Sequence, residues 1–187
     1  MIEKYKENLK GRYPTTKIVF SLLEERKVKN IVETGTIRKY NNWSGDGYST
    51  LIFGEYCKNV EGQLWTCDID PEAIKISKDI TNEYSDYIHY IIDDSIKFLT
   101  NFKEKIDLLY LDSFNSTKGM EEQASEHNKK ELLAAMNKLH QDSIIFIDDY
   151  HHASKKGKGM YSVPFLLNNG WKLVSDVKNY QAVLIRK

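Results

Sequence analysis

Strand-like and helix-like segments alternate along most of this 187-residue chain, and this alternation restricts the fold more than any other feature. Short apolar runs predict buried strands, and each is followed by a segment whose apolar residues recur at helical spacing. The predicted strands cover residues 30–34, 63–70, 87–93, 106–112 and 143–149. Strands that alternate with helices form a parallel sheet covered on both faces, because each right-handed crossover lays a helix against the sheet.

Helix-capping residues locate several of the predicted helices. Thr15 or Thr16 can cap a first helix, and Asp70 can cap a helix that starts at Pro71, since proline has no N–H group to lose there. Further helices are expected from residues 47–60, from residues 95–102 and in a long segment that ends near residue 141.

The end of the chain departs from this alternation. Residues 171–187, "WKLVSDVKNYQAVLIRK", contain two strand-like runs separated by a tight "VKN" turn, which is too short for a helical crossover. The last strand should therefore run antiparallel to its neighbour. The predicted fold class is α/β, a Rossmann-like, doubly wound sheet of seven strands that is mostly parallel with an antiparallel last strand.

A chain of this length supports one core, so we expect a single domain with an N-terminal helical cap (residues 1–29) and a ligand-binding core (residues 30–187). Lys+Arg 27 balance Asp+Glu 27, which argues against nucleic-acid and membrane partners. Cys57 and Cys67 lie in apolar surroundings and are predicted to be core thiols. The charged N-terminus and the lack of long apolar runs predict a soluble, cytoplasmic protein. A homodimer is compatible with the sequence, which leaves the oligomeric state open.

Polar and acidic residues follow every predicted parallel strand. The strand ends read "VETG", "CDID", "IIDDS", "YLDS" and "IDDYHH". Asp and Ser commonly cap the next helix, so any one of these ends could be purely structural. Ligands of open α/β sheets bind at the carboxyl ends of the strands, and five polar ends at one edge therefore indicate a binding site.

These ends resemble a known family. Together, "VETGT", "GDGYST", "CDID", "DDS", "LDS" and "IDDYHH" are similar to motifs of the class I S-adenosylmethionine-dependent methyltransferases, particularly the small-molecule O-methyltransferases related to macrocin and catechol-type enzymes. The resemblance covers residues 30–187. It implies an enzyme that transfers a methyl group from S-adenosylmethionine to a hydroxyl of a small molecule, such as a sugar-containing or polyketide-like metabolite.

The resemblance assigns the methionine end of the cofactor to the first turn and the helix after it. Gly35 would leave room for the cofactor, Glu33 would accept from its ammonium group, and Thr36 belongs to the same turn. The cofactor carboxylate would meet the N-terminus of the following helix. The residues assigned there are Gly45, Gly47, Ser49 and Thr50, which could also be ordinary helix caps.

The nucleoside end of the cofactor is assigned to the next strand ends. Asp68 would accept both ribose hydroxyls, whereas Asp70 is expected to cap a helix. Asp94 and Ser95 would read the adenine amino group, with Asp93 as the second choice. The resemblance places Asp112 beside the cofactor as well.

An insertion, "TIRKYNNWSGD", separates Gly35 from Gly47 where relatives have a tight turn. This spacing argues against a compact dinucleotide-binding turn. The loop could fold over the cofactor, or it could be a surface hairpin unrelated to ligand. Because it offers few core residues, we expect it to be mobile without ligand and ordered with it.

Catechol-type relatives bind a divalent cation with acids at the ends of strands four and five. That resemblance assigns a Mg²⁺ site to Asp112, Asp148 and Asp149, although metal-independent relatives also carry acids there. Asp148 and either His151 or His152 are the candidates for accepting the proton of the substrate.

Two basic features of the sequence are less specific. His127 is expected at the surface or behind the site. The "KKGKG" stretch, residues 155–159, could attract an anionic substrate group or could form a solvated loop.

Two other function classes fit the same fold. One is a non-catalytic cofactor-binding or partner-binding domain, and the other is a hydroxylase-like relative of this group. Damaged acids at strands four and five would favour loss of activity, and they are intact here. Nucleic-acid methylation is disfavoured because "LDSFN" stands where a "N/D-P-P-Y/F" motif would follow strand four.

Overall fold

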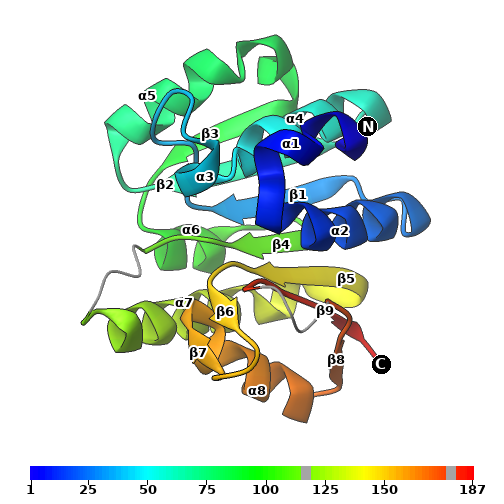
Figure 1. Ribbon diagram of the computed structural model, residues 1–187, viewed down its shortest axis with the longest axis vertical. Coiled ribbons are helices and arrows are strands. Elements are labelled where there is room, and N and C mark those ends of the chain that lie inside the picture. The colour runs from blue at the N-terminus through cyan, green and yellow to red at the C-terminus, as the bar shows by residue number, and fades with distance from the viewer. Residues whose placement is uncertain (115–118, 176–179) are drawn as a thin grey trace.

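A seven-stranded sheet forms the centre of the computed structural model, which describes residues 1–114, 119–175 and 180–187 (Figure 1). The strand order is β3-β2-β1-β4-β5-β9-β8. β1 to β5 are parallel, and β9 is antiparallel to both β5 and β8. The predicted fold class is thereby confirmed, while the predicted "VKN" turn lies outside the described residues. The strands are β1 Asn30–Thr34, β2 Gln63–Asp68, β3 Ile88–Ile92, β4 Ile106–Leu111, β5 Leu139–Ile147, β8 Trp171–Leu173 and β9 Ala182–Arg186.

Helices connect these strands and precede them. The α-helices are α1 Lys6–Leu9, α2 Tyr13–Glu25, α3 Trp43–Asp46, α4 Ser49–Val60, α5 Pro71–Ile80, α6 Ser95–Asn101, α7 Glu121–Ala135 and α8 Ser162–Asn168. Short 3-10 helices are η1 Ile2–Tyr5, η2 Lys10–Arg12, η3 Asn82–Tyr87, η4 Met136–Lys138 and η5 Lys158–Met160. A small ribbon follows β5, made of β6 Tyr150–His151 and β7 Lys156–Gly157.

Two apolar layers cover the two faces of the sheet. α2 and α4 pack on one face, where Phe20 and Phe53 stack against each other. α6, α7 and α8 pack on the other face, around Leu99, Leu132 and Leu166. Alternate residues of β1 serve the two layers, since Ile31 belongs to the first and Val32 to the second. Each such fully buried side chain contributes roughly 1.5–3 kcal/mol to folding, so the sheet edge that carries the site rests on a well-packed support.

The predicted helix boundaries are correct for α5 and need correction for α2. Asp70 caps α5, because its side chain accepts from the backbone N–H of Glu72 at 2.9 Å. α2 begins at Tyr13, with proline in its first turn, so Thr15 and Thr16 lie inside the helix and do not cap it. The hydroxyl of Thr16 donates back to the carbonyl of Arg12 at 2.9 Å. Proline overrides the threonines here because its fixed φ suits the first helical turn.

Both cysteines are buried and unpaired, as predicted. Cys57 lies in α4 and Cys67 in β2, and burial raises the pKa of each thiol to about 12. Neither is a reactive thiolate at neutral pH. Among the described residues, no helix combines the length and the apolar character needed to cross a membrane.

Candidate active site

A pocket of about 530 Å³ opens at the carboxyl edge of the sheet. Residues that follow β1, β2, β3 and β4 line it, together with His127 of α7. The parallel register brings these strand ends to one edge, as Thr34 of β1 pairs with Cys67 of β2 and Leu111 of β4. Small-molecule sites commonly measure ~300–1,000 Å³, so the pocket has room for a ligand of nucleoside size or larger.

Asp68 and Ile69, at the end of β2, present two kinds of surface to the pocket. Asp68 accepts from the backbone N–H of Asp70 at 2.9 Å, and burial raises the pKa of its carboxyl group. Ile69 is 72% exposed although it is strongly apolar. A carboxylate beside an open apolar side chain suits a ligand that carries hydroxyl groups next to a flat ring.

Asp94 and Ser95 lie at the start of α6 and also line the pocket. Asp94 caps this helix by accepting from the backbone N–H of Lys97 at 2.8 Å. Asp93 instead pairs with the Lys97 side chain at 2.9 Å and does not line the pocket, so the ranking of Asp94 above Asp93 agrees with their positions.

His127 lines the pocket next to the start of α6, whereas the sequence suggests a surface or supporting position. Its Nε2 lies 3.0 Å from the hydroxyl of Ser95 and 3.5 Å from Glu131. The Glu131 carboxylate raises the pKa of His127. Phe114, 5.4 Å away between ring centroids, completes this side of the pocket. Motifs at the ends of strands could not predict that a residue of α7 lines the pocket.

Glu33 of β1 is fully buried and precedes the pocket-lining Gly35 by two residues. Its Oε2 accepts from the hydroxyls of Thr50 and Thr66 at 2.7 and 2.8 Å. Within the described part of the chain, Oε1 has no hydrogen-bond partner. Burial raises the pKa of Glu33 to about 7, and the side chains of Ser49, Thr50 and Thr66 oppose this rise by hydrogen bonding. A half-satisfied buried carboxylate has capacity left for a further donor.

Gly35 makes the turn between β1 and the pocket. Its φ is +85°, a left-handed conformation that glycine adopts without strain. A Cβ atom at this position would lie 2.7 Å from the carbonyl oxygen of Asp112. The structure therefore gives a different reason for the glycine from the predicted one: it admits the backbone that follows β4, whatever the ligand.

Gly35→Ala is expected to lower the free energy of unfolding by about 2–4 kcal/mol. The alanine would be strained in the left-handed conformation, and its Cβ atom would overlap the backbone of Asp112. For a chain of this size that corresponds to a fall in melting temperature of about 5–15 °C. Differential scanning calorimetry measures it. The matched control is Gly11→Ala, since a Cβ atom there meets nothing within 4 Å. Equal melting temperatures for the two variants would contradict this account of the turn.

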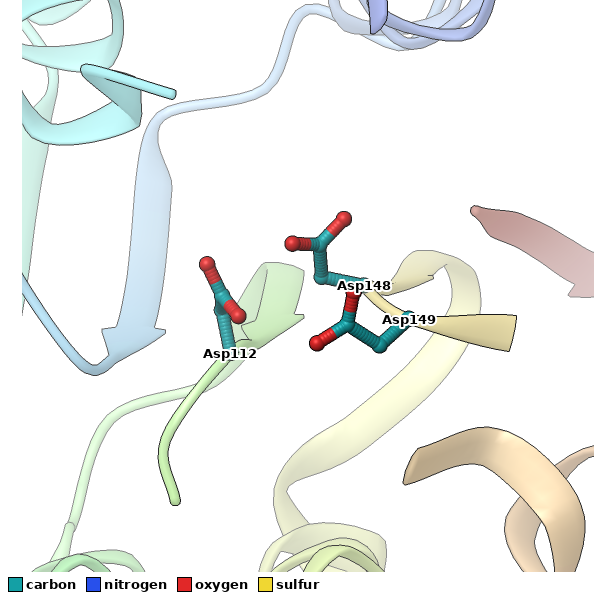
Figure 2. Close-up of side chains that lie close together, drawn as sticks. All are labelled: Asp112, Asp148 and Asp149. Carbon is teal, nitrogen blue, oxygen red and sulfur yellow. The ribbon is translucent and has the colours of Figure 1, made fainter. Parts of the chain in front are cut away.

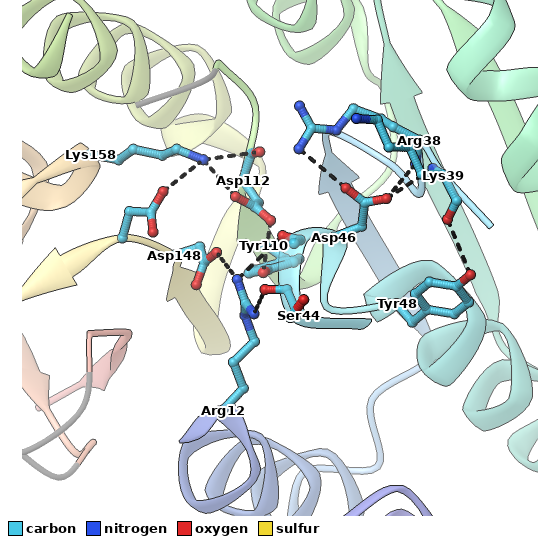
Figure 3. A network of polar contacts seen from close by, with 12 residues as sticks. Arg12, Arg38, Lys39, Ser44, Asp46, Tyr48, Tyr110, Asp112, Asp148 and Lys158 are labelled. Atoms are coloured by element: carbon cyan, nitrogen blue, oxygen red, sulfur yellow. Dashed lines mark hydrogen bonds and ion pairs between the residues drawn. The ribbon is translucent and has the colours of Figure 1, made fainter. Parts of the chain in front are cut away.

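The inserted segment, residues 36–46, is held by its own contacts. Buried Asp46 accepts from the backbone N–H groups of Arg38 and Lys39 at 3.1 and 2.9 Å (Figure 3). Trp43 stacks on Tyr48 with ring centroids 4.3 Å apart. The premise that this segment has little to pack against is therefore wrong, since backbone hydrogen bonds to Asp46 and an aromatic pair hold it, while its ordering by ligand stays a prediction. Arg38 and Asp46 line the pocket.

The residues of the predicted carboxylate-binding helix start do not line this pocket, and their cofactor-binding role stays a prediction. Gly45 belongs to α3 and Gly47 ends that helix with a φ of +64°, so neither glycine lines the pocket. Ser49 starts α4 but faces a small cavity beside Arg12. Thr50 is fully buried, with its hydroxyl given to Glu33. Of this helix start, Ser49 thus lines a separate cavity and Thr50 is engaged with Glu33.

Thr36 does line the pocket, and its hydroxyl connects two helices behind it. It donates to Ser77 of α5 at 2.7 Å and lies 3.1 Å from the hydroxyl of Thr50 in α4. This contact holds the turn after β1 against both helices.

Asp112, Asp148 and Asp149 converge next to the pocket (Figure 2). Each offers a carboxylate oxygen, and these oxygens lie within 4.8 Å of one another. Asp112 also lines the pocket and so joins the cluster to it. The predicted convergence is confirmed, whereas metal binding stays a prediction.

Two cations of the chain enter this acidic cluster (Figure 3). Lys158 Nζ lies 2.6 Å from Asp112 Oδ1 and 3.4 Å from Asp149 Oδ2. Arg12 lies 3.6 Å from Asp148 Oδ2. Burial alone would lower the pKa of Lys158, but the surrounding carboxylates outweigh it and raise that pKa, so the side chain is a fixed cation at neutral pH. Two of the three acids predicted to bind a metal ion, Asp112 and Asp149, are therefore already paired with one ammonium group.

Asp148 is the most buried acid of the cluster, at 2% exposure. Burial raises its pKa to about 7, and the charges of Asp112 and Asp149 add to the rise while Arg12 and Lys158 oppose it. Gln181 donates to its Oδ1 at 2.8 Å. A carboxylate that titrates near neutral pH suits proton transfer.

Comparison with known proteins places this arrangement in a family. The family described as "Methyltransferase domain" matches residues 44–150, which is more than half of the chain. The chain belongs to this methyltransferase family. Its resemblance to the class I S-adenosylmethionine-dependent methyltransferases is thereby confirmed.

Curated and solved relatives of the methyltransferase agree with that assignment. O-methyltransferase ankF of Aspergillus thermomutatus is 27% identical over 134 residues, which cover 70% of this chain and 49% of that protein. The chain thus spans about half the length of the curated relative it matches.

Two solved structures share the fold of the methyltransferase. The methyltransferase PaMTH1 of Podospora anserina, solved with bound S-adenosylhomocysteine, superposes with a TM-score of 0.68 at 15% identity, covering 97% of this chain and 81% of that one. A methyltransferase from Geobacter sulfurreducens gives 0.63 at 11% identity, covering 91% and 76%.

The two histidines predicted as proton acceptors lie away from the pocket of the methyltransferase. His151 is exposed in β6, and His152 Nε2 lies 2.9 Å from the carbonyl oxygen of Gln181. Neither lines the pocket. Asp148 does not line the pocket either, but it belongs to the acidic cluster that Asp112 joins to the pocket, so the catalytic role of the histidines stays a prediction.

Sequence reasoning missed Arg12, Lys158 and Gln181, which carry no family motif. Lys158 belongs to the "KKGKG" stretch, which the sequence suggested was either a patch that attracts substrate or a solvated loop. Neither interpretation fits the buried position of Lys158. A signal was present, since Gly157 and Gly159 flank it and glycines permit close backbone packing. Arg12 and Gln181 offered none.

Proposed function

We propose that this chain transfers a methyl group from S-adenosylmethionine to a hydroxyl group of a small molecule, such as a sugar-containing or polyketide-like metabolite. One observation carries the proposal: the pocket that holds Asp68 and Ile69 continues, through Asp112, into a cluster with a buried acid that titrates near neutral pH. Family membership supports the reaction class, and the similarity to O-methyltransferase ankF supports oxygen as the acceptor atom.

The residues around the pocket fit S-adenosylmethionine. Asp68 would accept the paired ribose hydroxyls, and the open apolar face of Ile69 would lie against the adenine ring. Asp94 and Ser95 would contact the adenine edge. The unpartnered Oε1 of Glu33 has capacity for the cofactor's ammonium group, directly or through water.

S-adenosylmethionine supplies an electrophilic methyl carbon, which the substrate oxygen takes as the carbon–sulfur bond breaks, leaving S-adenosylhomocysteine. The chain's own residues align the hydroxyl and accept its proton. We assign proton acceptance to Asp148, because Gln181 and Arg12 hold its two carboxylate oxygens at the cluster next to the pocket. Arg12 comes from the N-terminal cap, so residues 1–29 contribute to the reaction centre.

The test of this function combines ligand binding with product analysis. S-adenosylhomocysteine is expected to bind with one-to-one stoichiometry in calorimetry and to raise the melting temperature, as a ligand selective for the native state must. Hydroxylated acceptors incubated with S-adenosylmethionine should gain one methyl group by mass spectrometry. Binding of NAD without binding of S-adenosylhomocysteine would refute the cofactor assignment. Binding without transfer to any acceptor would favour a non-catalytic domain.

A further inference from the structure

The acidic cluster has an internal source of positive charge. With all three carboxylates ionised, Asp112, Asp148 and Asp149 carry three negative charges. Lys158 and Arg12 compensate two of these charges. Carboxylates gathered this closely repel one another unless a cation or a proton intervenes. Here the chain itself supplies that cation.

The Lys158 ammonium takes the place that a metal ion would need. Its Nζ lies 2.6 Å from Asp112 Oδ1, 3.3 Å from the Asp112 carbonyl oxygen and 3.4 Å from Asp149 Oδ2. Mg²⁺ requires oxygen ligands at about 2.0–2.1 Å in near-octahedral geometry. A divalent ion and this ammonium cannot both occupy the space between these carboxylates, because they compete for the same oxygens.

Close packing directs Lys158 into the cluster. Gly157 has a φ of +99°, and a Cβ atom there would overlap the backbone carbonyl of Asp149. A Cβ atom at Gly159 would lie 2.9 Å from the Tyr150 ring. Ser125 of α7 donates to the Gly157 carbonyl at 2.7 Å. The backbone on either side of Lys158 is therefore fixed by packing at Gly157 and Gly159. The Lys158 side chain is only 5% exposed.

We propose that Lys158 replaces the divalent cation at this reaction centre, so that the chain's own ammonium group neutralises and positions Asp112 and Asp149 without a metal ion. This inference rests on the proposed function, since it concerns the same site. It predicts that the native protein has no divalent-cation site at the cluster. Removing Lys158 should create one, because the cluster then holds three carboxylates against Arg12 alone.

The experiment compares Mn²⁺ binding by wild type, Lys158→Met and the matched control Lys156→Met. Lys156 is exposed in β7, two residues before Lys158. At 1 mM Mn²⁺, the wild type and Lys156→Met should show no stoichiometric binding by electron paramagnetic resonance and no shift in melting temperature. Lys158→Met should bind one ion. If the free Mn²⁺ concentration is 100 times its Kd, the melting temperature of this variant should rise by about 5–10 °C. A further Asp112→Asn change in Lys158→Met should abolish the gain.

Two results would overturn the inference. One is a wild-type protein that binds one Mn²⁺ and loses it on Asp112→Asn, and this measurement needs no folded Lys158→Met. The other is a folded Lys158→Met that gains no ion. Metal binding is measured without cofactor, so the outcome stays separate from the proposed function, which fails instead if S-adenosylhomocysteine does not bind the wild type.

Discussion

Asp68→Ala is expected to weaken S-adenosylhomocysteine binding by at least about 100-fold, because each hydrogen bond to a charged group contributes about 1.5–3 kcal/mol and two ribose hydroxyls lose their shared acceptor. Asp68 lines the pocket, and its carboxyl group is partly desolvated before any ligand binds. No other carboxylate at the end of β2 can replace it, since Asp70 is engaged in capping α5. Isothermal titration calorimetry measures the change in Kd.

The control for Asp68→Ala is Asp86→Ala, which removes an exposed carboxylate of η3 that does not line the pocket. Its Kd should equal that of the wild type. Asp68→Asn should lie between the two, because the amide keeps one acceptor oxygen and loses the charge. Wild-type affinity in Asp68→Ala would show that the ribose does not lie at the end of β2.

Asp148→Asn is expected to lower the rate of methyl transfer by about 10²–10⁴-fold, the usual contribution of a positioned proton acceptor. The asparagine keeps an oxygen for the hydrogen bond from Gln181 and loses the ability to take a proton. Single-turnover assays at saturating cofactor separate this effect from binding. Because the residue lies outside the pocket lining, the affinity for S-adenosylhomocysteine should change little.

The pH profile gives an independent measure of the role of Asp148. The wild-type rate should rise with pH through about 7, because the carboxyl group accepts a proton only once it is ionised and burial has raised its pKa to about 7. Asp148→Asn should lack this acidic limb. If the acidic limb of the pH–rate profile survives in Asp148→Asn, the proton acceptor would instead be His151 or His152. Double variants would then identify which of the two it is.

The same raised pKa has a consequence for stability with a definite sign. The native state binds the Asp148 proton more tightly than the unfolded chain, in which the pKa of this carboxyl group is near its ordinary value of 3.8. The contribution of this group to the free energy of unfolding therefore decreases as pH rises from about 4 to about 7. Asp148→Asn removes that component of the pH dependence.

The sheet was predictable from the sequence because its signals are local. "NIVET" and "QLWTCD" are apolar runs of strand length, and they form β1 and β2 with nearly the predicted bounds. Asp70 before Pro71 locates the start of α5 correctly, since both capping and the proline preference act within one turn. The convergence of Asp112, Asp148 and Asp149 followed from parallel topology, which brings the ends of neighbouring strands together.

Short-range signals failed where contacts come from distant segments. The helix α8 was not predicted from the sequence. It belongs to the crossover between β5 and β8, which run parallel because both are antiparallel to β9. The inserted segment resembled a loop without a core, yet Trp43 packs between Tyr48 and Tyr5, and Tyr5 lies in the N-terminal cap. Ser49 and Thr50 fit a carboxylate-binding helix start until the structure placed Thr50 against Glu33.

The amino-acid sequence by itself determined the order of strands and helices, the antiparallel end of the sheet and the edge at which acids gather, because periodicity, capping and chain connectivity are properties of neighbouring residues. The tertiary structure alone decided which charges meet those acids. Arg12 and Lys158 are 146 positions apart in the numbering (158 − 12), and both reach the cluster from opposite ends of the chain. Electrostatic compensation acts through space, so only the packed fold reveals that the carboxylates already have their cations.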